Sequence, residues 1–198
     1  MLRKIISGIT SGLLIGIGGT VFLASENKVV GAVAFTIGLL SICHYGLSLY
    51  TGKIGYMFAK HDGEAWSVLL WGLLGNLIGA LVTGLLIRAA LPAIGEKAAA
   101  LGAAKLEQTA LQTLIRACFC GVLVYVAVNL FRDKKTVLGI LIGIPVFILS
   151  GFEHSIADMF YFFAGGNFSL PVWGFLGLAV LGNSAGALVF DRLLHYSK

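Results

Sequence analysis

The stretch "GFEHSIADMF" (151–160) carries three ionisable side chains, Glu153, His154 and Asp158, and directly follows the apolar run "TVLGILIGIPVFILS" (136–150). The ordinary pKa of histidine lies near neutrality, so His154 could take or give a proton at physiological pH. Asp158 follows His154 by four residues, and a continuous helix would place both on one face. There Asp158 could stabilise a protonated His154, or it could be capped by backbone groups or be protonated itself. Glu153 would point elsewhere, which favours a hydrogen-bonding role at the ends of a loop over contact with a substrate.

The same three side chains could instead ligate a metal ion in an intramembrane enzyme, since histidine and carboxylates are common metal ligands. Such a site would need further histidines or carboxylates at membrane depth, and only His44 is available. We therefore predict neither a metal nor a cofactor, and we do not expect an enzyme.

The composition places these groups in a membrane protein. Of the 198 residues, 58% are hydrophobic and 12% charged, and the mean hydropathy is +0.95. A soluble globular chain is about 45–50% apolar and about 25% charged. The net charge of +5 comes with no long basic run, and the basic residues lie mostly at segment ends, so we predict no nucleic-acid partner. The partner expected from this composition is the lipid bilayer.

Six apolar segments are each near or above the ~20 residues that a membrane-spanning helix needs. They predict an all-α integral membrane protein in which residues 1–198 form one transmembrane domain. The alanine-rich stretch 93–113 predicts a surface helix between the third and fourth segments. The segments are 5–24, 29–52, 66–92, 114–131, 136–165 and 172–190.

The basic residues predict the orientation in the membrane. With the N-terminus inside, the inner ends and loops carry eight lysines and arginines and the outer ones carry four, which by the positive-inside rule puts both termini in the cytoplasm. The inner set is Arg3, Lys4, Lys60, Arg132, Lys134, Lys135, Arg192 and Lys198, and the outer set is Lys28, Arg88, Lys97 and Lys105.

An internal repeat relates the two halves of the chain. "LLGNLIGAL" (73–81) returns as "VLGNSAGAL" (180–188), 107 positions later. Three helices per copy is an odd number, so the copies, about 1–95 and 108–198, would face opposite ways. Inverted repeats of this kind are typical of channels and transporters.

The middle segment of each half is interrupted by polar residues, "CHYGLSLYTGK" (43–53) in one and "SGFEHSIAD" (150–158) in the other. Corresponding breaks in two repeats indicate a transport path near the membrane midplane. Broken helices leave N–H groups free, and such ends favour anions. We expect Asn76 and Asn183, in the two repeated motifs, to bond to these freed backbone groups and to line the middle of the path.

At this point the motifs resemble one known family. "SGFEHSIADMF" resembles the fifth-helix motif of the formate/nitrite transporters, and "GLSLYTG" (46–52) resembles their second-helix break. Lys105 followed by "IRACFCGVLVYVAV" (115–128), and the two L-G-N motifs, also match. The resemblance implies a homopentamer of aquaporin-like protomers in a bacterial cytoplasmic membrane, each with its own pore for small monovalent anions. Formate, nitrite and hydrosulfide are such anions, and the residues leave the choice among them open.

The resemblance also implies roles for single residues. His154 would be the central histidine and Thr51 its hydroxyl partner, and Lys105 the basic residue of the outer vestibule. An outer hydrophobic constriction would be formed by Phe35, Leu39 and Phe147, and an inner one by Leu49, Tyr50 and Val124.

Five positions depart from the pattern of that family. Asp158 stands where asparagine is usual, Gly121 replaces an asparagine, Tyr50 a phenylalanine, Ser48 an acid, and Lys53 an asparagine or serine. Lys53 could reach inward or balance Asp158.

The function expected from these residues is a channel or proton-coupled transporter in which His154 protonates a weak-acid anion between the constrictions. Lys105 and Arg116 could attract anions to the outer mouth or anchor the interface; attraction is favoured for Lys105 and anchoring for Arg116. The alternative is a neutral-solute pore of the aquaporin type, for which the two N-P-A boxes are missing from the sequence.

Overall fold

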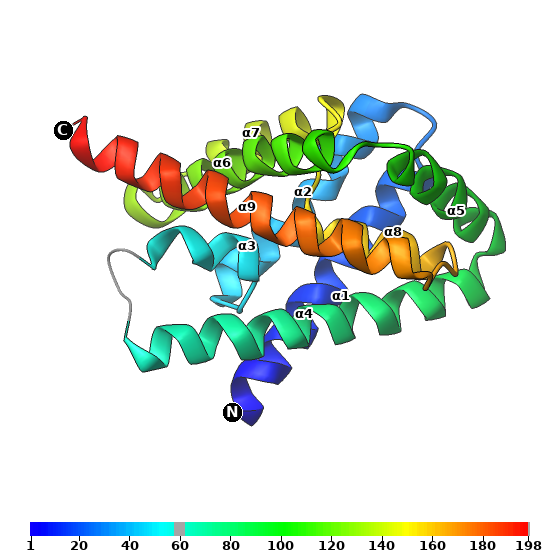
Figure 1. Cartoon of the computed structure of the whole chain (residues 1–198), viewed down its shortest axis with the longest axis horizontal. Helices are drawn as coiled ribbons and strands as arrows, with labels where there is room; N and C mark the ends of the chain where they lie inside the picture. The colour runs from blue at the N-terminus through cyan, green and yellow to red at the C-terminus, as the bar shows by residue number, and fades with distance from the viewer. Residues whose placement is uncertain (58–61, 198) are drawn as a thin grey trace.

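The computed structural model of the chain describes residues 1–57 and 62–197, which form a bundle of α-helices (Figure 1). Five of these helices are long and apolar enough to cross a membrane. Apolar segments of this length and number make the chain a multi-pass membrane protein. The five are α1 (Leu2–Ala24), α2 (Lys28–Tyr45), α4 (Gly63–Ala90), α6 (Ala110–Lys134) and α9 (Leu170–Tyr196).

Glycines bring α1 against α4 and α6 against α9. A Cβ added at Gly8 would lie 2.9 Å from Cα of Gly75, and one added at Gly186 would lie 2.9 Å from Cα of Cys118. Such distances leave no room for a side chain, so these helices approach backbone to backbone. These glycines of α1, α4 and α9 are thus occupied within one chain, whereas a Cβ added at Gly174 or Gly177 of α9 would meet nothing within 4 Å.

The second apolar segment is interrupted, as its sequence predicts. α2 ends at Gly46, whose φ of 65° lies in the left-handed region that suits glycine. The chain then runs extended to Leu49, and α3 (Tyr50–Lys53) and η1 (Ile54–Tyr56) follow. The fourth segment of the sequence, by contrast, continues as one helix through Lys134.

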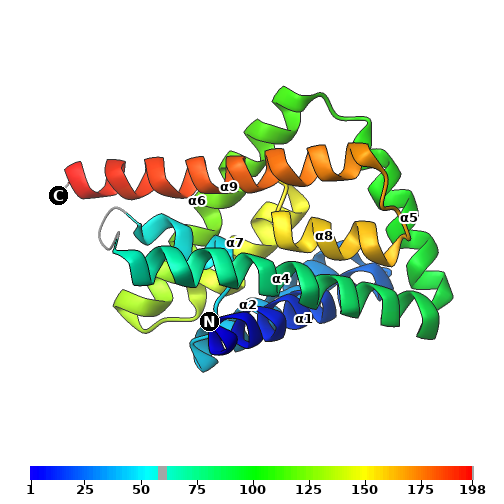
Figure 2. The ribbon, with the colours of Figure 1, turned by 60° about the horizontal axis from the view of Figure 1, so that its bottom comes forward.

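The fifth apolar segment is interrupted in the same way. α7 (Leu138–Leu149) ends before Gly151, which has a φ of 68°, and α8 (Ser155–Ala164) begins after three further residues. With 12 and 10 residues, each is too short to span a bilayer alone. All ten residues of α8 are buried, and Figure 2 shows α8 between α4 and α9.

The helix expected within 93–113 is α5 (Pro92–Leu106), and α6 begins separately behind a capping box of Thr109 and Gln112. One face of α5 packs on α8, with Ala98 fully buried. α5 lies at the end of the bundle opposite the C-terminal turns of α9 (Figure 2). Two lysines counted for the orientation, Lys60 and Lys198, lie outside the described residues.

Candidate functional site

His154 is held in one orientation at the second break. It is the N-cap of α8 and only 3% exposed. Its Nδ1 accepts the backbone N–H of Ala157 at 3.1 Å, and its Nε2 lies 2.9 Å from Oγ1 of Thr51 in the first break. Because Nδ1 is an acceptor, the neutral ring carries its proton on Nε2 and donates it to Thr51. The two breaks therefore meet in a single hydrogen bond.

Apolar side chains surround this hydrogen bond. The His154 ring stacks on Phe147 with ring centroids 5.6 Å apart, and Phe147 meets Phe35 edge-on at 6.3 Å. Leu39, Leu49 and Val124 are also buried. These side chains make up a hydrophobic barrier in the centre of the chain.

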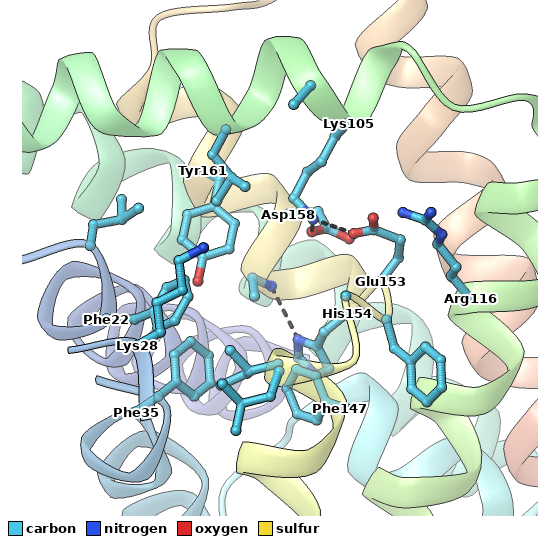
Figure 3. A pocket seen from close by; sticks show the side chains of 18 of the residues that line it. Phe22, Lys28, Phe35, Lys105, Arg116, Phe147, Glu153, His154, Asp158 and Tyr161 are labelled. Carbon is cyan, nitrogen blue, oxygen red and sulfur yellow. Dashed lines mark hydrogen bonds and ion pairs between the residues drawn. The ribbon is translucent and has the colours of Figure 1, made fainter. Parts of the chain in front are cut away.

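A cavity of about 640 Å³, here named the α5-side cavity, reaches the barrier from one end of the bundle. Phe35, Phe147 and His154 line its deep end, and the exposed Lys28 and Arg116 line its rim (Figure 3). Charged groups thus lie at the mouth, and one imidazole lies at the bottom.

A second cavity of about 270 Å³, the α3-side cavity, approaches the barrier from the opposite side. Leu39, Leu49 and Gly52 line it together with three basic residues, Lys53, Arg132 and Lys135. The two cavities share no lining residue. A solute passing from one to the other would therefore have to cross the barrier.

The residues of the two predicted constrictions lie at different places relative to the cavities. Leu39, expected with Phe35 and Phe147, lines the α3-side cavity instead. Val124 and Tyr50 line neither cavity. The Tyr50 hydroxyl lies 2.9 Å from Oγ of Ser184, so its side chain is directed toward α9.

Lys105 is not a free cation. Its Nζ contacts the Glu153 carboxylate and lies 2.9 Å from Oδ1 of Asp158, and its side chain is 11% exposed. Burial favours the neutral amine, but the carboxylates of Asp158 and Glu153 outweigh it and raise the pKa of Lys105 above the ordinary lysine value. Gln108 donates to Oε1 of Glu153 at 2.6 Å.

Asp158 therefore faces Lys105 and not His154. The expected i, i+4 pair fails because His154 precedes α8 as its cap and so lies outside the helix. Glu153 has the hydrogen-bonding role that was favoured for it, joining the break to α5. Gln108 was missed, although its spacing of three residues from Lys105 was the available signal.

Asn76 and Asn183 bond to the backbone of the two breaks in the same pattern. Oδ1 of Asn76 accepts the N–H of Tyr50, and its Nδ2 donates to the carbonyls of Gly8 and Ser48, all at 2.9 Å. Both asparagines are fully buried and line neither cavity, so they lie beside the cavities, not on them. Asn183 accepts from Ser155 and donates to Ala117 and Glu153, at 2.8–2.9 Å.

In the basic lining of the α3-side cavity, Arg132 and Lys135 were read from the sequence only as a topology signal, and Lys53 as a residue that could reach inward or balance Asp158. Arg132 lies 3.8 Å from the ring centre of Tyr56 and bonds to Asp133 at 2.8 Å. Among the described residues, Lys53 makes no hydrogen bond or ion pair. Within residues 1–57 and 62–197, no three histidine, cysteine or acidic side chains are arranged to hold a metal ion.

Solved structures share this architecture. An "FNT family ion channel" superposes with a TM-score of 0.84 at 24% identity, over 99% of this chain and 90% of its own. A "Pentameric formate channel with formate bound" gives 0.80 at 23% identity, over 99% and 96%. At these identities the likeness establishes the fold.

The sequence comparisons extend the likeness to relatives. "Uncharacterized transporter YrhG" of Bacillus subtilis (strain 168) is 31% identical over 194 residues, covering 87% of this chain and 72% of that protein. "Formate channel FocA" of Escherichia coli (strain K12) is 29% identical over 194 residues, covering 80% of this chain and 65% of that protein. The family model "Formate/nitrite transporter" matches residues 1–197. With the breaks, the histidine and nearly the whole length in agreement, this chain belongs to the formate/nitrite transporter family.

Proposed function

We propose that this chain is a channel or proton-coupled transporter for small monovalent weak-acid anions of the formate, nitrite or hydrosulfide class. The observation that carries the proposal is the His154–Thr51 hydrogen bond at the barrier between two cavities. The names of the relatives agree with it, since FocA is called a formate channel. No observation favours a neutral-solute pore.

Crossing the barrier is the costly step for an anion. An ion loses most of its hydration among Phe35, Phe147 and Leu49, and an isolated charge in such surroundings is strongly destabilised. The Nε2–H of His154 can turn from Thr51 to the solute and supply one charge-assisted hydrogen bond. That hydrogen bond leaves the charge on the anion. Protonation removes the charge, so the solute crosses as a neutral acid.

His154 can itself supply that proton only if its Nδ1 gains one. The N–H of Ala157 must then give up its bond to Nδ1, which uncaps α8. Proton donation by His154 is therefore coupled to a local opening of the first turn of α8.

The proposal also covers the internal repeats, the oligomeric state and the orientation in the membrane. Two inverted repeats, about 1–95 and 108–198, are supported by the matching bonds of Asn76 and Asn183. A homopentamer is supported by the solved channel described as pentameric. We place the protein in a cytoplasmic membrane with both termini inside, so that the α5-side cavity opens outward, because Arg3, Lys4, Arg132, Lys134, Lys135 and Arg192 lie in the described inner ends.

Flux into proteoliposomes tests this function. We expect uptake of formate, nitrite or hydrosulfide that rises as the outer pH falls, and we expect His154→Phe to abolish that pH dependence in a folded oligomer. Loss of a hydrogen bond to a charged group costs about 1.5–3 kcal/mol, which predicts a roughly tenfold to hundredfold lower rate.

His154→Asn retains polarity but cannot relay a proton, so it should lose proton coupling if His154 itself supplies the proton. His44→Asn is the matched control, because His44 lies at the end of α2 and its ring bonds only to the carbonyl of Leu40. If His154→Asn transports with the rate and pH profile of the wild type, the role proposed for His154 is refuted.

A further inference from the structure

The wall of the α5-side cavity holds an unusual group of charges, the Lys105–Glu153–Asp158 cluster. Glu153 is 2% exposed and Asp158 1% exposed, and both carboxyl groups contact the single ammonium of Lys105. All three residues line the cavity, and Figure 3 shows them together beside His154. The cluster therefore combines two acids and one base almost out of contact with water.

Two ionised carboxylates and one ammonium would leave one buried negative charge. An uncompensated buried charge is strongly unfavourable, and two carboxylates sharing a site favour protonation of one of them. The two carboxyl groups lie close to each other, since both contact Nζ of Lys105.

The contacts indicate which of the two carboxyl groups is protonated. Glu153 has a donor on each oxygen, Gln108 on Oε1 and Lys105 on Oε2. Asp158 has Lys105 on Oδ1, but its buried Oδ2 has no partner in the part of the chain that the structure describes. A proton on Oδ2 would neutralise the cluster, and it would reach the cavity when the Asp158 side chain turns, because Oδ2 itself is buried.

Other titratable groups near Asp158 do not replace this proton. Tyr161 lies on α8 itself, with Lys105 Nζ 5.8 Å from its ring centre. On α4, Arg88 reaches the carbonyl of Ala164 at the far end of α8. α1 and α9 carry their charged residues in terminal turns at the opposite end of the bundle. The other titratable groups that line the cavity or lie near the cluster are His154, Lys97 on α5, Cys120 and Arg116 on α6, and Glu26 and Lys28 at the rim.

We propose that Asp158 stores a proton in the α5-side cavity and transfers it to the anion before the anion reaches His154. The O–H bond of the Asp158 carboxyl breaks, an O–H bond forms on formate, and formic acid and an Asp158 carboxylate result. Lys105 stabilises the new carboxylate, and water in the cavity returns the proton. In water the two groups are acids of similar strength, and loss of hydration in the cavity disfavours bare formate as it disfavours the Asp158 carboxylate, so the proton can pass between them.

This inference rests on the proposed function and assigns its proton to a second residue. It also removes a difficulty at the barrier, because both ring nitrogens of His154 are already engaged. His154 then needs only to donate Nε2–H to the neutral acid, and α8 keeps its cap. The expected stoichiometry is one proton moved with each formate.

The stored proton can be observed without transport. The infrared spectrum of the wild-type protein at neutral pH should contain the C=O stretch of a protonated carboxylic acid, which shifts in D₂O. Asp158→Asn and Glu153→Gln should each abolish it, because one carboxylate is then balanced by Lys105.

Asp158→Asn introduces the residue that is usual in the formate/nitrite transporter family, and size-exclusion chromatography reports whether each variant assembles. Glu26→Gln is the matched control, since it removes a carboxylate from the rim of the same cavity.

Transport gives the second readout. Proteoliposomes containing a pH-sensitive dye and given labelled formate should acidify in proportion to formate uptake, and both cluster variants should lose this acidification and the dependence on outer pH. A wild-type spectrum without the band, or cluster variants with unchanged band and pH profile, would overturn the inference while leaving formate transport intact. A band that behaves as expected in a protein that moves no weak-acid anion would support the proton site and refute the proposed function.

Discussion

One lysine in the α5-side cavity is paired, and one lysine in the α3-side cavity is not. In the α5-side cavity Lys105 is neutralised by Glu153 and Asp158, whereas Lys53 in the α3-side cavity has no ion-pair partner among the described residues. Lys53 follows Gly52 directly, next to Leu49 on the barrier. An unpaired ammonium so close to the barrier would concentrate anions on that side.

Replacing Lys53 tests this difference. Two unit charges 4 Å apart in water attract by about 1 kcal/mol, so Lys53→Gln should reduce formate flux from the α3 side about fivefold at low ionic strength. Screening by salt should shrink the defect. Planar-bilayer currents with formate supplied from one side at a time measure the effect.

Lys97→Gln is the control for Lys53→Gln, because Lys97 lines the α5-side cavity and should act from the other side. A loss that is equal from both sides, or independent of salt, would mean that Lys53 has a structural role.

A contact between single residues could be predicted where a whole motif resembles that of a family. The contact of His154 with Thr51 was expected from the resemblance, and the structure has it at 2.9 Å. The pairing of Asp158 was not predictable, because helical spacing assumes that both residues belong to the helix, and the break excludes His154. The neutralisation of Lys105 depends on contacts across 48 positions, which local spacing does not report.

At the scale of the helices, the stability of the two breaks depends on hydrogen bonds to their free backbone groups. Unpaired backbone groups inside a membrane cost several kcal/mol each, and one asparagine serves each break. Asn183→Ala would leave the N–H of Ser155 and the carbonyl of Glu153 without this partner, at about 1–3 kcal/mol for each uncompensated group. We expect a loss of about 2–5 kcal/mol in unfolding free energy and a disordered second break.

Thermal unfolding in detergent measures this loss, with Asn129→Ala as the matched control. Asn129 also lies in a long helix, but it makes one 3.4 Å contact with the Tyr125 hydroxyl. If the two alanine variants unfold at the same temperature, the bonds of Asn183 do not hold the break together.

The positions of the elements were largely predictable, and their burial was not. Both breaks could be located from the sequence, because each contains a glycine next to polar residues. In the structure these glycines, Gly46 and Gly151, have φ of 65° and 68°. The complete burial of α8 depends on α4, α5 and α9 packing around it. The hydrophobic periodicity of the ten residues of α8 cannot report which helices pack around them.

On the scale of the whole molecule, the parts of the proposed path all belong to a single chain. Both cavities, the barrier and the His154–Thr51 bond come from one protomer. Gly8, Gly75 and Gly186 are occupied inside the chain by α1–α4 and α6–α9 packing. Contacts between protomers would therefore use the exposed apolar side chains of the outer helix faces, such as Val33, Ile37 and Leu181.

Mixed oligomers test whether each protomer works alone. We expect native mass spectrometry of the detergent-solubilised protein to show five copies, and not monomers or tetramers only. When wild-type and His154→Phe chains are co-expressed in equal amounts, formate flux should fall to about half, because each protomer contributes its own path independently. A pore shared on the pentamer axis would have mutant side chains in nearly every assembly, so its flux would fall far below half. A flux strictly proportional to the wild-type fraction, measured over several mixing ratios, is the outcome that five separate paths require.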